Sequence, residues 1–192
     1  MDLADKISEA IAGIGIPNEH QQYANYWEFT TFDGEPISSY ETQLAGHIAH
    51  IDQFEVEKDF QGRSLGPTML YTMVRHFESE GAKLIQIHKV QGDGLSFWAR
   101  YAAIGPNGAP AKELYAPPFI KDEFIERFGD PLMQAFITAS TDPKEAWYEI
   151  THPSSGVSRE VIARLNIASY KKTMSMDLNH PVVRSRLGLD NL

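Results

Sequence analysis

The 192-residue chain contains no cysteine. This absence excludes a disulfide framework, a thiolate zinc site, an iron–sulfur cluster and a cysteine nucleophile. The sequence also lacks any apolar run near the roughly 18 residues that a membrane-spanning helix needs. Residues 1–11 are acidic and amphipathic, without the basic start and the small-residue cleavage site of a signal peptide. We therefore expect a mature cytoplasmic protein with no membrane partner.

Positive charge is scarce. The chain has 17 Lys and Arg against 26 Asp and Glu, which gives a formal net charge of −9. Residues 1–156 carry a net −12, whereas residues 157–192 carry +3. Nucleic acids are held through Lys and Arg contacts to phosphate, so an acidic body disfavours them as partners. The same charge favours a cationic ligand such as an amine. The basic C-terminal stretch can be a contact patch or a solvated helix face.

The apolar pattern predicts helices and strands in alternation. We expect helices over residues 2–12, 65–80, 95–104, 119–128, 131–138 and 159–170, and strands over 23–32, 37–43, 47–57, 83–90 and 146–151. Asp33-Gly34 predicts a type I′ hairpin turn, in which both central residues need a positive φ. In the strand over 47–57, alternation places four side chains on one face, namely His50, Asp52, Phe54 and Val56.

The junction between the strand over 47–57 and the helix over 65–80 has the sequence Gln61-Gly62-Arg63-Ser64-Leu65-Gly66. Small residues let a backbone curl so that several N–H groups point into one concavity. A helix N-terminus adds the positive end of its dipole, which favours a phosphate or pyrophosphate. The Gly-Lys-Ser/Thr of a Walker A loop and the glycine spacing of a dinucleotide fingerprint are both absent. The alternative is a tight turn whose glycines only permit packing.

This junction resembles the acyl-CoA-binding signature of the GNAT superfamily of N-acetyltransferases, Gln/Arg-x-x-Gly-x-Gly/Ala. Gln61 matches the first position and Gly66 the last, whereas Ser64 replaces the middle glycine. Downstream, Tyr101-Ala102-Ala103-Ile104-Gly105 is similar to the family's Tyr-x-x-x-Gly, but Pro106 stands where Phe is usual. The resemblance covers roughly residues 44–106.

The resemblance implies an α+β fold with a mixed, mostly antiparallel sheet flanked by helices. It implies a GNAT-like domain over residues 1–152, with 107–145 as a loop and helical insertion and 153–192 as a C-terminal extension. It implies acetyl-CoA as co-substrate, a primary amine of a small molecule or a protein lysine as acceptor, and a homodimer as one possible assembly. The cofactor-binding residues would be Phe54, Val56, Gln61, Gly62, Arg63, Ser64, Leu65 and Gly66.

Acetyl transfer to an amine needs a base for the amine and a proton donor beside the leaving thiolate. The resemblance makes Tyr101 the candidate acid, since a phenol with a reference pKa of about 10 can protonate a thiolate whose acid has a pKa of about 8.5. Tyr101 can equally be a packing residue. With no cysteine, direct attack in a ternary complex is favoured over an acyl-cysteine intermediate.

His50 is the candidate base, because imidazole titrates near neutral pH. Asp52 could orient His50 or bind the cationic amine, and His47 and His88 are weaker candidates. A histidine satisfied by a backbone carbonyl is the alternative for His50. A metal site is not expected, because alternation sends His47 and His50 to opposite faces. A non-catalytic acyl-CoA-binding module that acts through a protein partner is the alternative function.

Overall fold

The computed structural model describes residues 2–90, 94–103, 143–159, 162 and 173–190. The chain divides into two compact units, one made of Met1–His88 with Leu187–Leu192 and one made of Lys89–Arg186. Among the described helices, none has the length and the apolar character needed to cross a membrane.

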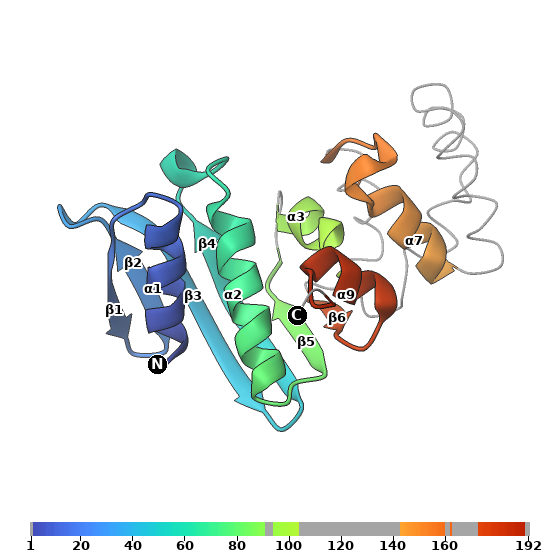
Figure 1. The fold of residues 1–192 in the computed structure, drawn as a ribbon, viewed down its shortest axis with the longest axis horizontal. Helices are drawn as coiled ribbons and strands as arrows, with labels where there is room; N and C mark the ends of the chain where they lie inside the picture. The colour runs from blue at the N-terminus through green and yellow to red at the C-terminus, as the bar shows by residue number, and fades with distance from the viewer. Residues whose placement is uncertain (1, 91–93, 104–142, 160–161, 163–172, 191–192) are drawn as a thin grey trace. The chain divides into compact units, whose positions relative to one another are not determined.

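The first unit is a sheet with two helices (Figure 1). Four strands are antiparallel in the order β1-β2-β3-β4, and β5 lies parallel beside β4. Its elements are α1 (Leu3–Gly13), β1 (Glu19–Tyr23), β2 (Tyr26–Thr30), β3 (Pro36–Ala45), β4 (Ile48–Val56), the 3₁₀ turn η1 (Lys58–Phe60), α2 (Leu65–Ser79) and β5 (Leu84–His88). The predicted α+β class with a mixed, mostly antiparallel sheet is confirmed.

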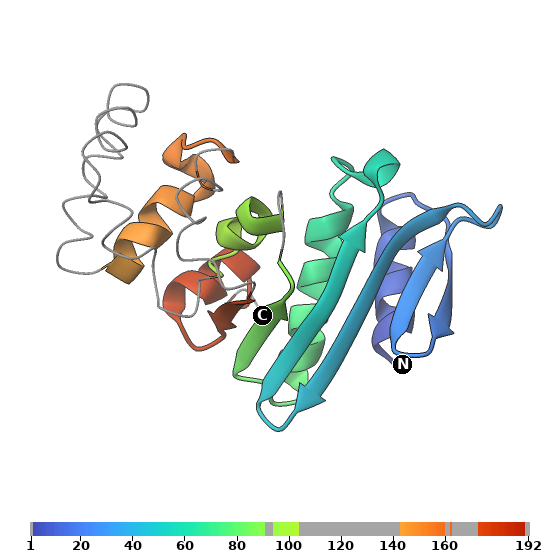
Figure 2. The same cartoon turned by 180° about the vertical axis from the view of Figure 1, so that it is seen from behind.

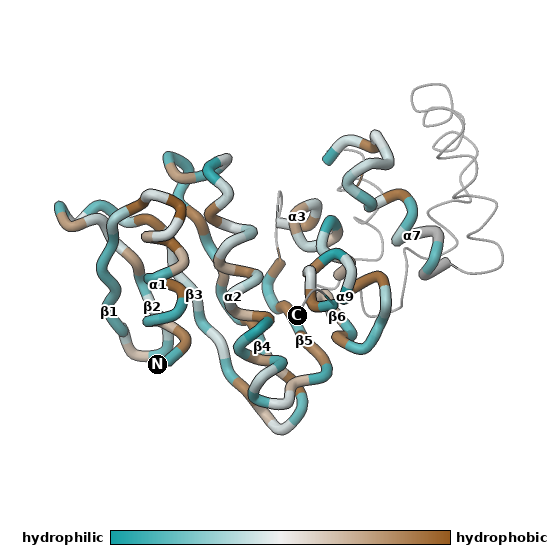
Figure 3. The backbone as a smooth tube through the Cα atoms, viewed as in Figure 1, coloured by the Kyte–Doolittle hydropathy of each residue, from teal (hydrophilic) through white to brown (hydrophobic). Residues whose placement is uncertain are grey.

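Both helices of this unit lie over the same face of the sheet, which Figure 2 shows from the uncovered side. The helix predicted over 65–80 is α2, and every apolar residue at its helical spacing is buried: Leu65, Met69, Leu70, Met73, Val74 and Phe77. Figure 3 shows apolar and polar stretches alternating along α1 and α2. The buried residues Ala49, Ile51, Ile85 and Ile87 come from the two parallel strands. The core therefore lies between the helices and one face of the sheet.

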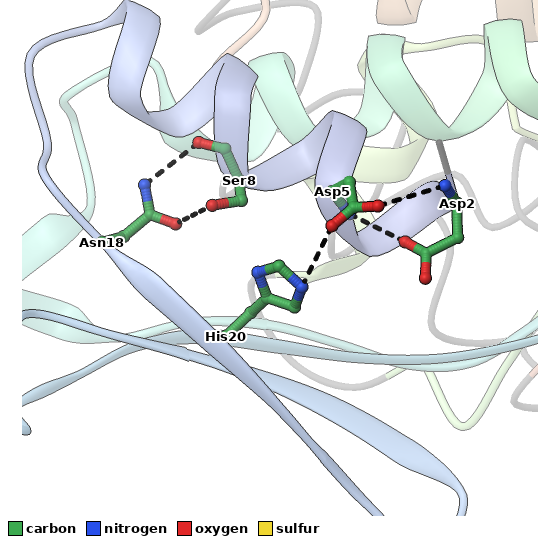
Figure 4. Close-up of polar contacts among 5 residues, drawn as sticks. All are labelled: Asp2, Asp5, Ser8, Asn18 and His20. Atoms are coloured by element: carbon green, nitrogen blue, oxygen red, sulfur yellow. Dashed lines mark hydrogen bonds and ion pairs between the residues drawn. The ribbon is translucent and has the colours of Figure 1, made fainter.

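Local hydrogen bonds fix the start of the chain (Figure 4). Asp2 caps α1, because its Oδ1 accepts from the Asp5 N–H at 2.9 Å while Asp5 Oδ2 accepts from the Asp2 N–H at 3.3 Å. Asn18 joins α1 to the beginning of β1 through both its amide groups, with the Ser8 hydroxyl at 2.8 Å and the Ser8 carbonyl at 3.0 Å. His20 on β1 pairs with Asp5 at 3.5 Å. These contacts hold α1 against the sheet.

Two predictions for the early strands are wrong. The aromatic run over 23–32 is not one strand, because the chain turns at Ala24 (φ 40°) and the run is divided between β1 and β2. The turn at Asp33-Gly34 is not type I′, since Gly34 (φ 83°) has a positive φ and Asp33 does not. The loop is longer and closes through the Thr31 N–H and the Glu35 carbonyl at 2.8 Å.

The second unit contains the described elements α3 (Gly94–Arg100), α7 (Pro143–Thr151), the 3₁₀ turn η2 (Pro153–Ser155), β6 (Thr173–Asp177) and most of α9 (Pro181–Leu187). The strand predicted over 146–151 is wrong, because these residues belong to α7. Aromatic and β-branched residues favour strands, but here Trp147, Ile150 and Thr151 form a buried helical face. The helices predicted over 119–128 and 131–138, and most of 159–170, lie outside the described residues.

Two arginines hold the second unit together. Arg186 of α9 donates to the carbonyls of Ala99 and Arg100 at 3.2 and 3.4 Å, to the Thr151 hydroxyl at 2.9 Å and to the Tyr148 carbonyl. Arg100 of α3 donates to the carbonyls of Thr151 and His152 at 3.3 and 2.6 Å. Burial lowers the pKa of Arg186 to about 10, so its guanidinium stays charged at neutral pH. Its carbonyl partners offset the cost of burying that charge.

Candidate functional site

Strands β4 and β5 pair over only part of their length. Their parallel register runs from Ile48 opposite Leu84 to Ile51 opposite Ile87. On its other side, β4 pairs with β3 as far as Val56. Within the first unit, the described register therefore leaves residues 52–56 of β4 with no partner on the β5 side. An unpaired strand edge offers N–H and C=O groups to an extended ligand, which can add to the sheet as another strand would.

A β-bulge begins this unpaired stretch. Glu41 lies opposite Gln53, but the next residue of β3, Thr42, lies opposite Ile51, so Asp52 is the additional residue. The bulge breaks the strict alternation predicted for β4. Phe54 lies opposite Tyr40 and so shares the face of Ile51. The prediction that His50 and Phe54 share a face is therefore wrong, because a bulge shifts the side chains beyond it by one position.

His50 and His88 meet where the two strands separate. Nδ1 of His50 lies 3.1 Å from Nε2 of His88, and the two rings stack with centroids 5.3 Å apart. Both side chains are half-buried. His50 lies opposite Gln86, and neither residue is on the buried face of Ile51 and Ile87. The pair therefore lies on the sheet face opposite the helices, beside the unpaired edge of β4.

No described contact joins Asp52 to His50, although the sequence suggests Asp52 as its orienting group. The structure supplies His88 instead, which the sequence ranks below His50. Thirty-eight residues separate the two histidines along the chain, and only the parallel pairing of β4 and β5 brings them together. The even spacing of Leu84, Gln86 and His88 along a strand was the one sequence signal for the face that His88 occupies.

The loop after β4 turns tightly into α2. Gly62 (φ 77°) and Ser64 (φ 63°) both adopt the left-handed conformation. Ser64 precedes the first residue of α2, and no side chain caps that helix end. The Gln61 side chain folds back and donates to the Val56 carbonyl at 3.0 Å, which links the loop to the end of β4. The replacement of glycine by Ser64 thus leaves the positive φ in place.

The side chains of this loop divide into exposed and buried ones. Arg63 is exposed and lies over the Phe60 ring, with 5.2 Å from its guanidinium carbon to the ring centroid. Leu65 is buried in the core, so it can contribute to a ligand site only through its backbone N–H. Gly66 lies in the first turn of α2. An exposed cation beside an uncapped helix N-terminus can bind phosphate groups.

Tyr101, the candidate acid, belongs to the second unit. It follows the end of α3, where its N–H donates to the Trp98 carbonyl at 3.0 Å. Its ring contacts that of Phe97, with centroids 5.1 Å apart, and its side chain is half-buried. Among the described residues, no cluster of three or more His, Asp or Glu side chains could hold a metal ion.

No protein-family model matches the sequence, and no curated protein is significantly similar to it. Solved structures do resemble it. A nourseothricin acetyltransferase aligns with 45% of this chain and 53% of its own, at 13% identity and a TM-score of 0.38. The ribosomal-protein-S18-alanine N-acetyltransferase from Escherichia coli aligns with 54% of this chain and 64% of its own, at 16% identity and a TM-score of 0.36.

A third structure is Rv2747 from Mycobacterium tuberculosis in complex with CoA. The alignment covers 92% of this chain and 96% of Rv2747, at 12% identity and a TM-score of 0.40. The likeness to these three structures is one of fold alone. The first two alignments span only about half to two thirds of those proteins.

Proposed function

We propose that the chain is an acyltransferase that moves an acetyl group from acetyl-CoA to a primary amine. The observation that supports this most is the continuity of the unpaired edge of β4 with the loop 61–66 and the uncapped start of α2. A cofactor with an extended amide-containing arm and a pyrophosphate matches these two features in order. The edge would bind the amides of the arm, and the loop would bind the pyrophosphate.

The loop residues would act mainly through their backbone. The N–H groups of Gly62, Ser64, Leu65 and Gly66 would face the phosphate oxygens, and Arg63 would add a positive charge. Phe54 and Val56 would contribute the strand edge, and Gln61 holds the loop to it through the Val56 carbonyl. A negatively charged side chain at Gly66 would oppose pyrophosphate by its charge and by its volume.

The acceptor amine must lose a proton before it attacks the thioester carbonyl. His50 is the proposed base, and His88 is its positioning residue, since the bond between the two rings sets which nitrogen of His50 carries the lone pair. The new C–N bond forms as the C–S bond breaks, and the thiolate leaves. Tyr101 is the proposed donor of the proton that the thiolate takes up.

A non-catalytic acyl-CoA-binding module remains the second candidate. The Ser64 and Pro106 departures from the family signature favour it. Release of CoA thiol from acetyl-CoA, measured with a panel of primary amines and without amine, separates the two. Amine-dependent thiol release that stops with His50→Ala supports the acyltransferase. Binding of acetyl-CoA without release by any amine supports the binding module.

A further inference from the structure

A separate pocket lies where β3 extends beyond β2. The register of β2 with β3 begins at Trp27 opposite Tyr40, so residues 41–45 of β3 have no described partner on the β2 side. The pocket at this step has a volume of about 490 Å³, within the range of small-molecule sites. Residues of α1, β1, β2, β3, β4 and α2 line it. None of the loop residues 61–66 and neither His50 nor His88 is among them.

The charged side chains of the pocket are mostly acidic. Asp2 from the start of α1, Glu41 from β3 and Asp52 from β4 all line it. Asp52 is the bulged residue, and a bulge re-aims a side chain. The one basic group among the described lining residues is His76. Burial first, and Lys6 second, lower the pKa of His76, so it is mostly neutral at pH 7.

Tyr40 supplies a second, independent observation. Its side chain lines the pocket and is only 1% exposed, yet its hydroxyl has no hydrogen-bond partner in the described part of the chain. Burial is the main cause that raises the pKa of Tyr40, and the charges of Asp2 and Asp5 add to it. The hydroxyl therefore stays protonated at neutral pH. A buried hydroxyl without a partner is costly unless a ligand or water completes it.

Aromatic rings complete the walls of the pocket. Trp27 and Phe77 line it together with the Tyr40 ring. Aromatic faces attract cations, and their apolar surface also accommodates methylene groups.

Lys6 is not among the lining residues, although its Nζ lies 3.2 Å from Nδ1 of the lining residue His76. No lysine or arginine is among the described residues that line the pocket, and Glu41 Oε1 accepts a hydrogen bond from Asn25 Nδ2 at 2.6 Å.

We propose that this pocket binds a small organic ammonium ion, a protonated primary amine with an apolar body. The ammonium N–H groups would donate to the Tyr40 hydroxyl and to the Asp52 carboxylate, with the other lining carboxylates adding negative charge, while the apolar body contacts the aromatic rings. This inference goes beyond the acyltransferase proposal, since the pocket shares no residue with the loop or the histidine pair.

The test is titration of the full chain with n-butylamine hydrochloride at pH 7, followed by the NMR shift of the Trp27 indole. The uncharged 1-pentanol, of similar size, is the ligand control. We expect Asp52→Asn and Tyr40→Phe each to weaken amine binding by about 3- to 10-fold, the range of one lost hydrogen bond. Glu9→Gln is the control for Glu41→Gln, because it makes the same charge change at an exposed position of α1. We expect Glu9→Gln to change the affinity for the amine by less than about 2-fold.

Three results would overturn the proposal: no shift with the amine, equal binding of 1-pentanol, or equal weakening by Glu41→Gln and Glu9→Gln. Gly66→Glu serves to separate this site from the proposed function. Amine binding that persists in Gly66→Glu supports an independent pocket. This holds even if acetyl-CoA binds neither to the unsubstituted protein nor to Gly66→Glu. Amine binding that requires the intact loop contradicts it.

Discussion

Nδ1 of His50 on β4 lies 3.1 Å from Nε2 of His88 on the parallel strand β5. A hydrogen bond between two imidazole nitrogens requires that one carries the proton and the other accepts it. When Nδ1 of His50 donates, its Nε2 holds a lone pair that faces away from His88. In that tautomer His50 can take a proton from a substrate at the point where β4 and β5 separate.

This arrangement predicts different losses for the two histidines. His50→Ala removes the base, and we expect kcat to fall by about 100-fold or more. His88→Gln keeps the base but loses the ring that orients it, so a smaller loss in kcat is expected, with an unchanged KM for acetyl-CoA. Steady-state thiol release over a range of pH measures both. His47→Gln is the matched control, because His47 is exposed and contacts the Gly81 carbonyl.

A purely structural role for His88 would give another pattern. His88→Gln would then lower stability and raise KM without altering the pH profile of kcat. Equal activity of His50→Ala and the unsubstituted protein would remove His50 from the mechanism.

Ser64 holds a left-handed backbone that glycine adopts with less strain. We expect Ser64→Gly to raise the free energy of unfolding by about 0.5–1 kcal/mol and to leave CoA affinity equal or higher. Ser64→Ala is the control, since it keeps the Cβ and loses only a hydroxyl that caps nothing on α2. Urea denaturation measures the difference. A loss of stability in Ser64→Gly would show that the serine side chain is itself required.

The stability of the first unit should depend on His76 in mildly acidic solution. Burial and the Lys6 charge lower the pKa of His76 from 6.5, so the folded chain binds a proton there less readily than the unfolded chain does. The unfolded state then takes up more protons as the pH falls, and the free energy of unfolding decreases between pH 7 and pH 5. His76→Gln should reduce this slope, and His47→Gln should not. Identical slopes for the unsubstituted protein, His76→Gln and His47→Gln would show that His76 does not cause this pH dependence.

Arg186 should dominate the stability of the second unit. Arg186→Met leaves the carbonyls of Ala99 and Tyr148 and the Thr151 hydroxyl without this donor, and we expect a loss of about 2–4 kcal/mol. Arg184→Met, on the same helix, removes a bond to the Leu178 carbonyl at 3.1 Å and should cost about 1 kcal/mol. Urea denaturation followed by tryptophan fluorescence compares them. Similar losses in the free energy of unfolding for Arg186→Met and Arg184→Met would contradict a dominant contribution of Arg186.

The sequence predicted the centre of the first unit well. The apolar spacing from Leu65 to Phe77 is strongly helical, and the strands over 47–57 and 83–90 are observed as β4 and β5. Local composition sufficed there because buried faces require a regular period. The bulge at Asp52 has no comparable signature, since a bulge depends on how the partner strand is matched, and the predicted alternation therefore failed beyond Ile51.

The second unit was harder to predict. Residues 146–151 carry the aromatic and β-branched composition of a strand, but tertiary contacts make them helical. Trp147 donates from Nε1 to the Ala103 carbonyl at 3.1 Å, a partner distant in sequence. The pairing of His50 with His88 depends on strand neighbours in the same way. The residue types of the proposed site could be predicted, but their partners could not.

The most direct test of the central claim is calorimetric titration of the full chain with acetyl-CoA and with CoA, for the unsubstituted protein, Gly66→Glu and Gly13→Glu. Gly13→Glu makes the same change at the exposed end of α1, where no atom lies within 4 Å of the new Cβ. Circular dichroism establishes that each protein is folded. We predict micromolar binding to the unsubstituted protein and to Gly13→Glu, and none to Gly66→Glu. Equal affinity of all three folded proteins, or no binding to any of them, would contradict the assignment of the loop.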